Sequence, residues 1–253
     1  MSAVSEVLLQ TIKELQSLPS LSQFALAGGT NLAFRFNHRE SQDIDLFCPE
    51  IVGIKHLETI ETEIINFYGK ENIEGLEYPA DKVNEQHSFF RFWVTKPCGA
   101  RIKVEIIQNM KMMDAIEVID EVRLVTTKDI GLFKLISGSI RAAKKDIYDL
   151  DFITEKIPII ELFEALKVKN EVFNKKEDKN IFNYNNNNCP TINPLLLLKF
   201  DMDRSKIDKI KPMHSDDVIR ILNNSKTWYQ SRSSWVSKIR KLYRYLGIKY
   251  PLY

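Results

Sequence analysis

Hydrophobic and polar residues follow two different periods along this chain of 253 residues. In the first part, short apolar runs and alternating segments predict strands at residues 24–27, 43–47, 88–94 and 100–107, and helices at 4–18, 30–36 and 52–68. From residue 127 onward the apolar residues recur with helical spacing, and we expect helices at 134–149, 159–173, 194–199, 215–223 and 234–246. The pattern predicts an α+β fold, in which a small mixed β-sheet core flanked by helices (residues 1–155) precedes a mostly helical C-terminal domain (residues 156–253).

A segment near residues 170–194 interrupts the helical part of the chain. It begins in a heavily charged stretch and holds Asn183 and the run from Asn185 to Asn188. Such a composition buries too little apolar surface to offset the entropy of ordering. We therefore expect a mobile loop or linker there.

Composition and charge are those of an ordinary folded protein. The chain is 44% apolar with a formal net charge of +2, and Cys48, Cys98 and Cys189 lack the spacing of a disulfide framework or a zinc knuckle. No segment approaches the run of about 18 apolar residues that a membrane span needs, and Glu6 interrupts the N-terminal region before any long apolar stretch. We expect a soluble cytoplasmic protein that has no membrane partner.

Two carboxylates and a glycine turn are the most informative features of the sequence. Asp43 and Asp45 are two residues apart on a predicted strand, so their side chains share one face. Paired carboxylates suit a Mg²⁺ ion that also binds substrate phosphates. Gly28 and Gly29 predict a turn whose backbone N–H groups can bind a phosphate, and Thr30 is expected to cap the following helix. The alternative is a solvated strand end that binds no metal.

Glu105 is the best candidate for the third carboxylate of a two-metal site. It lies on the polar face of the predicted strand 100–107. Arg101 and Lys103 share that face, so Glu105 could instead be a surface residue neutralised by its basic neighbours.

A further group of polar residues falls on the predicted helix 134–149. Two cations and two small residues recur at helical spacing on one face, with room for a ligand between the charges: Lys134, Ser137, Gly138 and Arg141. Asp146 and Asp149 could hold one of these cations in place or help to position an incoming hydroxyl. The alternative is the solvated polar face of an ordinary surface helix.

The sequence resembles the AbiEii/AbiGii toxin family, a branch of the DNA polymerase β-like nucleotidyltransferases, in features that follow one another in order across about residues 22–155. They are Gly28-Gly29-Thr30, Arg39-x-Ser41-x-Asp43-Ile44-Asp45-Leu46-Phe47 and Lys134…Arg141…Lys145-Asp146-x-x-Asp149-Leu150. Two positions depart from the pattern, because Asn37 stands where relatives often have Gly, and Glu105 stands where Asp is common in the superfamily. The resemblance implies that the sheet is a nucleotidyltransferase core.

The resemblance also implies the reaction, which is Mg²⁺-dependent transfer of a nucleoside monophosphate from a nucleoside triphosphate at a two-metal site. It assigns nucleotide binding to Gly28, Gly29, Thr30, Arg39, Ser41, Lys134 and Arg141, metal binding to Asp43, Asp45 and Glu105, and further catalytic roles to Lys134, Asp146 and Asp149. The second cation at the triphosphate is either Arg39 or Arg141. Family members act as toxins of bacterial toxin–antitoxin or phage-defence systems, so an antitoxin protein is an expected partner.

The C-terminal end is basic. Residues 199–253 carry 13 Lys and Arg and five Asp, a local charge of +8, which leaves −6 for the rest of the chain. Aromatic residues alternate with these cations, as in surfaces that bind a phosphate backbone and unpaired bases. Trp235 falls on the apolar stripe of its predicted helix and is expected in the core. An RNA acceptor is indicated, and the family suggests a tRNA; the alternative is a basic helical region that binds no nucleic acid.

Two other functions are open at this point. One is a nucleotide-binding module without turnover, against which the intact Asp43, Asp45 and Lys134 argue. The other is a transferase that modifies protein.

Overall fold

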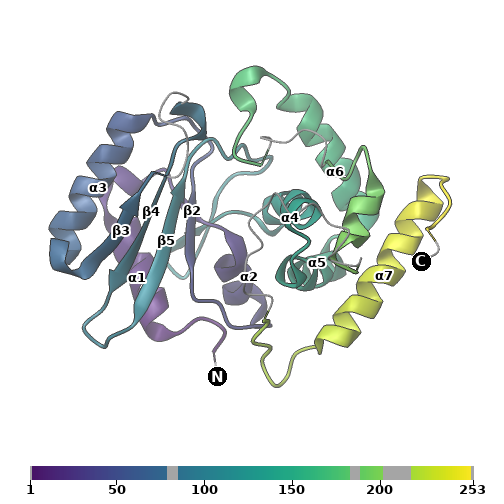
Figure 1. Ribbon diagram of the computed structural model, residues 1–253, viewed down its shortest axis with the longest axis horizontal. Coiled ribbons are helices and arrows are strands. Elements are labelled where there is room, and N and C mark those ends of the chain that lie inside the picture. Colours follow the sequence, from purple (N-terminus) through teal and green to yellow (C-terminus); the bar gives the residue numbers. More distant parts are fainter. Residues whose placement is uncertain (1, 79–84, 183–188, 202–217, 252–253) are drawn as a thin grey trace. The chain divides into compact units, whose positions relative to one another are not determined.

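The computed structural model describes residues 2–78, 85–182, 189–201 and 218–251. The chain forms two compact units, each of which is described by itself (Figure 1). Unit 1 comprises Met1–Thr126 and Phe173–Ile181, and unit 2 comprises Thr127–Val172 and Phe182–Tyr253. This division follows packing, and its boundary after Thr126 differs from the predicted boundary after residue 155.

Unit 1 is built on a mixed sheet of seven strands in the order β3-β4-β5-β2-β1-β7-β6. The strands are β1 (Ala25–Leu26), β2 (Ile44–Phe47), β3 (Ile73–Glu77), β4 (Phe89–Thr95), β5 (Arg101–Ile107), β6 (Glu117–Ile119) and β7 (Val122–Leu124). Strand β2 pairs in parallel with β5 and antiparallel with β1. The predicted α+β fold with a small mixed sheet is confirmed, and β3, β6 and β7 are strands that the sequence pattern missed.

Strands β4 and β5 show why this sheet has one buried face. Phe90, Phe92 and Val94 of β4 are buried, and so are Val104 and Ile106 of β5. The residues that alternate with these along each strand are polar, aromatic or basic, and they are at least partly exposed. Because side chains alternate across a strand, the apolar period of two places one face in the core and leaves the other face for polar groups.

The described residues of unit 1 also form the helices α1 (Glu6–Ser17), α2 (Gly28–Phe36) and α3 (Ile54–Tyr68). Helices α1 and α3 lie on the same side of the strands (Figure 1). Glu14 of α1 joins them, because it accepts a hydrogen bond of 3.0 Å from the Tyr68 hydroxyl at the end of α3. Short 3₁₀ turns occur at Pro19–Leu21, Lys70–Asn72, Glu85–His87 and Lys176–Asp178.

Unit 2 is helical and contains α4 (Thr127–Arg141), α5 (Lys144–Lys156), α6 (Ile159–Val172), the 3₁₀ segment η6 (Pro194–Asp201) and α7 (Trp228–Tyr245). Its core includes the fully buried Trp235, whose indole N–H donates to the Leu197 carbonyl at 3.0 Å. The prediction that Trp235 belongs to the core is confirmed. Asp129 of α4 and Lys169 of α6 form a buried ion pair of 3.4 Å, and the Lys169 ammonium lies 3.8 Å from the centre of the Phe133 ring.

Four sequence predictions differ from the structure. Thr30 is not the cap of α2, because the helix already begins at Gly28. The predicted helix 134–149 is two helices, since Ala142 adopts φ 54° between α4 and α5. Residues 194–201 form a 3₁₀ segment, and residues 218–223, the described part of the predicted helix 215–223, are not helical.

Part of the expected mobile linker also has defined structure. In unit 1 the Asn109 side-chain amide donates to the carbonyls of Glu177 and Lys179 at 3.0 and 2.9 Å, which fastens the segment Phe173–Ile181. Residues 183–188, which hold the asparagine run of the prediction, lie outside the described residues.

Candidate active site

The turn from β1 into α2 brings backbone against two charged side chains. Gly28 begins the helix with φ +62°, a left-handed conformation that favours glycine. A Cβ at Gly28 would overlap the Asp45 carboxylate oxygen Oδ2, and a Cβ at Gly29 would overlap the Arg39 guanidinium. A side chain at either glycine would therefore displace one of these charged groups, and the N-terminus of α2 lies directly beside a carboxylate and a guanidinium.

Hydroxyl groups hold the segment between the glycines and the carboxylates. The Thr30 hydroxyl donates to the backbone carbonyl of Asp43 and shares a hydrogen bond of 2.8 Å with the Ser41 hydroxyl. Arg39 is only 5% exposed, and its Nη1 donates to the Glu40 carbonyl at 3.0 Å. The structure thus brings Gly28, Gly29, Thr30, Arg39 and Ser41 together at one end of α2.

The two aspartates flank a buried position at the start of β2. Ile44 is fully buried, Asp43 is exposed and Asp45 is partly exposed. Asp45 lies on β2 and Asp43 directly precedes it, and an i, i+2 spacing places side chains on the same side of an extended chain. The backbone N–H of Ala27 donates to the Asp45 carbonyl at 2.8 Å, which ties β2 to the residue that precedes the glycine turn.

Glu105 lies next to Asp45 across the sheet. The two residues are register partners on the parallel strands β2 and β5. The Glu105 oxygen Oε1 contacts Arg91 Nε at 2.7 Å, Arg91 Nη2 at 2.6 Å and Lys103 Nζ at 3.2 Å. Burial raises the pKa of the Glu105 carboxyl, but Lys103 and Arg91 outweigh it and hold that pKa below its ordinary value. Glu105 is therefore an anion, adjacent to Asp45 and also neutralised by basic neighbours.

The carboxylate oxygens at this end of the sheet in unit 1 are chemically suitable ligands for a divalent cation. Asp43 and Asp45 supply hard oxygen ligands beside the N-terminus of α2, and Glu105 lies next to Asp45 across the sheet, with its Oε1 held by Arg91 and Lys103. Among the described residues, no group of three or more His, Cys, Asp or Glu is gathered closely enough to hold an ion.

Unit 2 contains a buried network around Lys134. The Lys134 ammonium lies 2.7 Å from Asp146 Oδ1 and 2.8 Å from Asp149 Oδ2, and the side chains of these aspartates are 2% and 0% exposed. Arg141 forms a fork on Asp146, with Nη2 at 2.9 Å from Oδ1 and Nε at 3.1 Å from Oδ2. Both aspartates hold Lys134, which is one of the two roles expected for them.

The network also corrects the expected free space on α4. Asp146, from the next helix, lies between the cations, and its Cβ would be 3.5 Å from a Cβ built on Gly138. Ser137 donates to Asp146 Oδ2 at 3.3 Å. The small residues at 137 and 138 therefore make room for a carboxylate rather than for a ligand. Burial raises the pKa of Asp146, but Arg141 and Lys134 outweigh it and keep that pKa below its ordinary value.

Sequence reasoning missed two charged residues that the structure brings into these networks. Arg91 of β4 pairs with Glu105 of the neighbouring strand β5. The alternation of residues in β4 places Arg91 on the polar face, but only the strand pairing shows that it meets Glu105. Asp151 is fully buried in unit 2 and binds Lys226 at 2.8 Å, Lys238 at 2.6 Å and the Ser234 hydroxyl at 2.6 Å. Nothing in the local sequence distinguishes Asp151 from a surface acid.

The C-terminal helix α7 presents cations opposite its buried stripe. Trp235, Ile239 and Leu242 are buried, whereas Arg240, Lys241 and Arg244 are exposed. Tyr229 is 80% exposed and Tyr245 is 54% exposed. The helix therefore combines exposed cations with exposed aromatic rings on one surface of unit 2.

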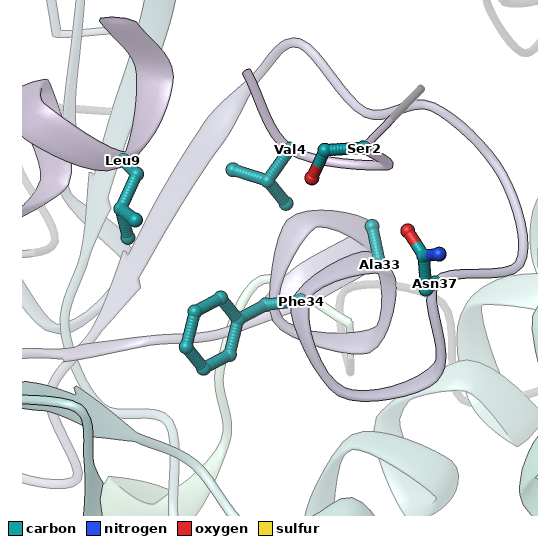
Figure 2. A pocket seen from close by; sticks show the side chains of 6 residues that line it. All are labelled: Ser2, Val4, Leu9, Ala33, Phe34 and Asn37. Atoms are coloured by element: carbon teal, nitrogen blue, oxygen red, sulfur yellow. The ribbon is translucent and has the colours of Figure 1, made fainter. Parts of the chain in front are cut away.

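A cavity of about 470 Å³ in unit 1 lies away from these groups (Figure 2). It is lined by Ser2, Val4, Leu9, Ala33, Phe34 and Asn37, and Ser2 and Asn37 lie together at one side (Figure 2). The lining has no charged residue and includes none of the predicted site residues. It does not suit a triphosphate.

Comparison with known proteins settles the family. The family model described as "Nucleotidyl transferase AbiEii toxin, Type IV TA system" matches residues 13–217, which span the glycine turn, the carboxylates and the Lys134 network. The chain belongs to the AbiEii nucleotidyltransferase toxin family. The resemblance drawn from the sequence is thereby confirmed, and this AbiEii chain is a nucleotidyltransferase of a type IV toxin–antitoxin family.

A solved structure shares the fold of this AbiEii chain. It is MenT4, a nucleotidyltransferase toxin from Mycobacterium tuberculosis, with 15% sequence identity and a TM-score of 0.50. The match covers 98% of this chain and 86% of MenT4. No curated protein matches the chain. Among the described residues, no helix has the length and apolar character needed to cross a membrane.

Proposed function

We propose that this AbiEii protein transfers a nucleoside monophosphate from a nucleoside triphosphate to an RNA acceptor, with a tRNA as the expected substrate. The observation that carries the proposal is the contact between Gly28 and Asp45, because it puts a carboxylate at the open N-terminus of α2. A helix N-terminus favours phosphate, and a carboxylate at the same place needs a bridging cation to coexist with it. That combination suits a metal-bound triphosphate.

In unit 1 we assign the phosphates to the backbone of Gly28 and Gly29 and to Arg39, with Thr30 and Ser41 fixing the segment through their hydroxyl groups. Arg39 is the stronger of the two candidates for the second phosphate-binding cation. Its guanidinium lies against Gly29 at the N-terminus of α2, the part of unit 1 to which we assign the phosphates.

In unit 2 we assign Lys134 to nucleotide binding, as the family motif implies, with Asp146 and Asp149 as the residues that orient its ammonium. Contacts of 2.7 and 2.8 Å with two buried aspartates give the Lys134 ammonium a fixed direction. Both aspartates share this role, and Arg141 fixes Asp146 from the outside.

Asp43, Asp45 and Glu105 are the residues that would hold Mg²⁺. Nucleotidyl transfer forms a bond between the acceptor oxygen and the α-phosphorus, breaks the bond from that phosphorus to pyrophosphate, and releases the hydroxyl proton. When bound, Mg²⁺ lowers the pKa of an attacking hydroxyl and neutralises the leaving pyrophosphate. Asp43 is exposed at the edge of the pair, so the proton can leave toward solvent.

The RNA acceptor is inferred from charge and exposed rings on α7. Arg240, Lys241 and Arg244 are exposed, and Tyr245 is 54% exposed beside them. Cations bind a phosphate backbone, and exposed aromatic rings stack on unpaired bases. The proposed activity is that of a toxin in a type IV toxin–antitoxin pair active in phage defence, with an antitoxin protein as its partner.

The test is a labelling reaction with each of the four labelled triphosphates, Mg²⁺, total RNA and total protein. We expect wild type to label RNA, and Asp43→Asn and Asp45→Asn to reduce labelling at least about 10³-fold, the scale on which loss of a key electrostatic group lowers catalysis. Asp120→Asn is the matched control, because Asp120 is an exposed acid in a turn of the same unit. Equal labelling by wild type and Asp43→Asn would refute the proposal, and label in the protein fraction alone would favour the protein-modifying alternative.

A further inference from the structure

Unit 1 has a second polar feature beside the candidate carboxylates, on the open face of β4 and β5. We call Arg91, Lys103 and Arg101 the basic strip. Arg91 comes from β4, and Lys103 and Arg101 come from β5. Their side chains are 27%, 26% and 54% exposed, so all three reach solvent while the opposite face of both strands is buried.

Strand register connects the basic strip to Asp45. Asp45 is the partner of Glu105, and Glu105 is the partner of Arg91, so the three residues form a row across β2, β5 and β4. Neighbouring strands are about 4.8 Å apart, which puts the Arg91 backbone about 10 Å from that of Asp45. Lys103 and Arg101 continue the strip along β5 in steps of about 7 Å. The strip therefore begins at the carboxylates and leads away from them.

Glu105 holds Arg91 and Lys103, the first two cations of the strip, without using all of their hydrogen-bond donors. Arg91 binds Glu105 through Nε and Nη2, and Lys103 contacts the same oxygen at 3.2 Å. A guanidinium has five N–H donors and an ammonium has three. Arg91 therefore keeps its Nη1 donors, and Lys103 keeps donors that face away from Glu105. One carboxylate holds two cations in place and neutralises only one of them.

Aromatic rings accompany the cations of the strip. The Arg91 guanidinium lies 5.4 Å from the centre of the Phe89 ring, and the Arg101 guanidinium lies 5.1 Å from the centre of the Trp93 ring. Arg101 also pairs with Glu74 at 2.9 Å. Flat rings and guanidinium planes on an open sheet face are the groups that stack with unpaired bases.

We propose that the basic strip binds backbone phosphates of a single-stranded end of the acceptor RNA and leads that end toward Asp45. This inference rests on the proposed function and adds a binding site in unit 1 to the one inferred on α7. Arg91 and Lys103, held by Glu105, bind the phosphate nearest the carboxylates. Arg101, whose guanidinium lies over the Trp93 ring, binds the next phosphate.

The test measures RNA and nucleotide binding separately. A fluorescent single-stranded oligoribonucleotide is titrated with wild type and with the Arg91→Gln/Lys103→Gln double variant, in the absence of triphosphate. We expect the double variant to bind RNA about tenfold more weakly at low salt. The slope of its log K against log [salt] should be shallower by about 0.7 for each lost phosphate contact. Affinity for a non-hydrolysable triphosphate analogue is measured without Mg²⁺, because Arg91 and Lys103 hold the proposed metal ligand Glu105, and is expected to stay within about twofold.

The matched control is Lys55→Gln/Lys70→Gln, which removes the same charge from exposed positions elsewhere in unit 1. Lys103→Gln alone keeps the Arg91–Glu105 pair and serves if the double variant does not fold. Equal RNA affinity of the strip and control variants overturns the inference, and so does a loss of triphosphate affinity with unchanged RNA affinity. If wild type labels RNA and the strip variants bind RNA normally, only the role of the basic strip is refuted. If wild type labels no RNA, the proposed function is refuted.

Discussion

At the scale of single residues, the glycines of the turn show how close approach places the chemistry. Gly28 touches Asp45 and Gly29 touches Arg39, so an anion and a cation both lie against the first turn of α2. The chain also contains a glycine with the same kind of backbone but no neighbours. Gly99 has φ +81° and nothing within 4 Å of a built Cβ. Comparing substitutions at Gly28 and Gly99 therefore separates the effect of backbone strain from the effect of displacing Asp45.

We predict that Gly28→Ala abolishes nucleotidyl transfer, because the added methyl group displaces the Asp45 carboxylate. Both Gly28→Ala and Gly99→Ala should lower the free energy of unfolding by about 1–2 kcal/mol, the cost of a left-handed conformation for an L-residue. Only Gly28→Ala should lose activity. Urea unfolding and the RNA-labelling assay measure the two effects, and normal labelling by folded Gly28→Ala would contradict the assigned role of the turn.

At the scale of elements, α5 organises unit 2 from two of its faces. Asp146 and Asp149 hold Lys134 of α4, and Asp151 holds Lys226 and Lys238. Lys238 lies on α7, so the buried Asp151 fixes the helix that carries the exposed cations. Burial raises the pKa of Asp151, but the hydrogen bonds from Lys226 and Lys238 outweigh it and lower that pKa.

We predict that Asp151→Asn lowers the free energy of unfolding by about 3–5 kcal/mol at pH 7, because it leaves two lysines beside an uncharged buried group. A carboxyl with a lowered folded-state pKa stabilises the fold above its unfolded pKa of about 3.9, and that contribution is lost as pH falls through the folded pKa. The difference between wild type and Asp151→Asn should therefore shrink in acid.

The control for this prediction is Asp201→Asn. Asp201 pairs with Arg232 of the same helix α7, but the two side chains are 31% and 42% exposed. Exposed ion pairs contribute about 0–1 kcal/mol. Urea unfolding at pH 7 and at pH values below 4 compares the variants, and equal destabilisation by the two substitutions would show that Asp151 does not anchor α7.

At the scale of the whole molecule, charge is divided between the ends of the chain. Residues 199–253 carry a net +8 and the rest carries −6, while the total is only +2. The acidic part contains the carboxylates proposed to hold Mg²⁺, and the basic part contains α7. Net charge near zero therefore hides a distribution suited to a cation in one part and a polyanion in the other.

We predict that Arg240→Gln/Lys241→Gln/Arg244→Gln weakens binding of tRNA and makes its salt dependence shallower by about 0.9 for each lost contact with a duplex phosphate. Lys156→Gln, an exposed cation at the end of α5 in the same unit, is the control and should leave the slope unchanged. Binding is followed by fluorescence anisotropy across a salt series. An unchanged slope in the triple variant would remove α7 from the RNA-binding surface.

Local sequence determined the alternation of β4 and β5, the paired carboxylates at the start of β2 and the buried stripe of α7. Each of these features depends on residues close together in the chain, where the period of two or 3.6 decides which side chains share a face. The same local reasoning failed between Lys134 and Asp149, because the backbone turn at Ala142 interrupts a pattern that reads as one helix.

Only the tertiary structure decided which charges meet. Parallel pairing of β2 with β5 put Glu105 beside Asp45, and antiparallel pairing of β4 with β5 put Arg91 on Glu105. The break between α4 and α5 folded Asp146 back onto Lys134. The reason is physical: strand register and helix packing are set by contacts between distant segments, and periodicity within one segment does not encode them.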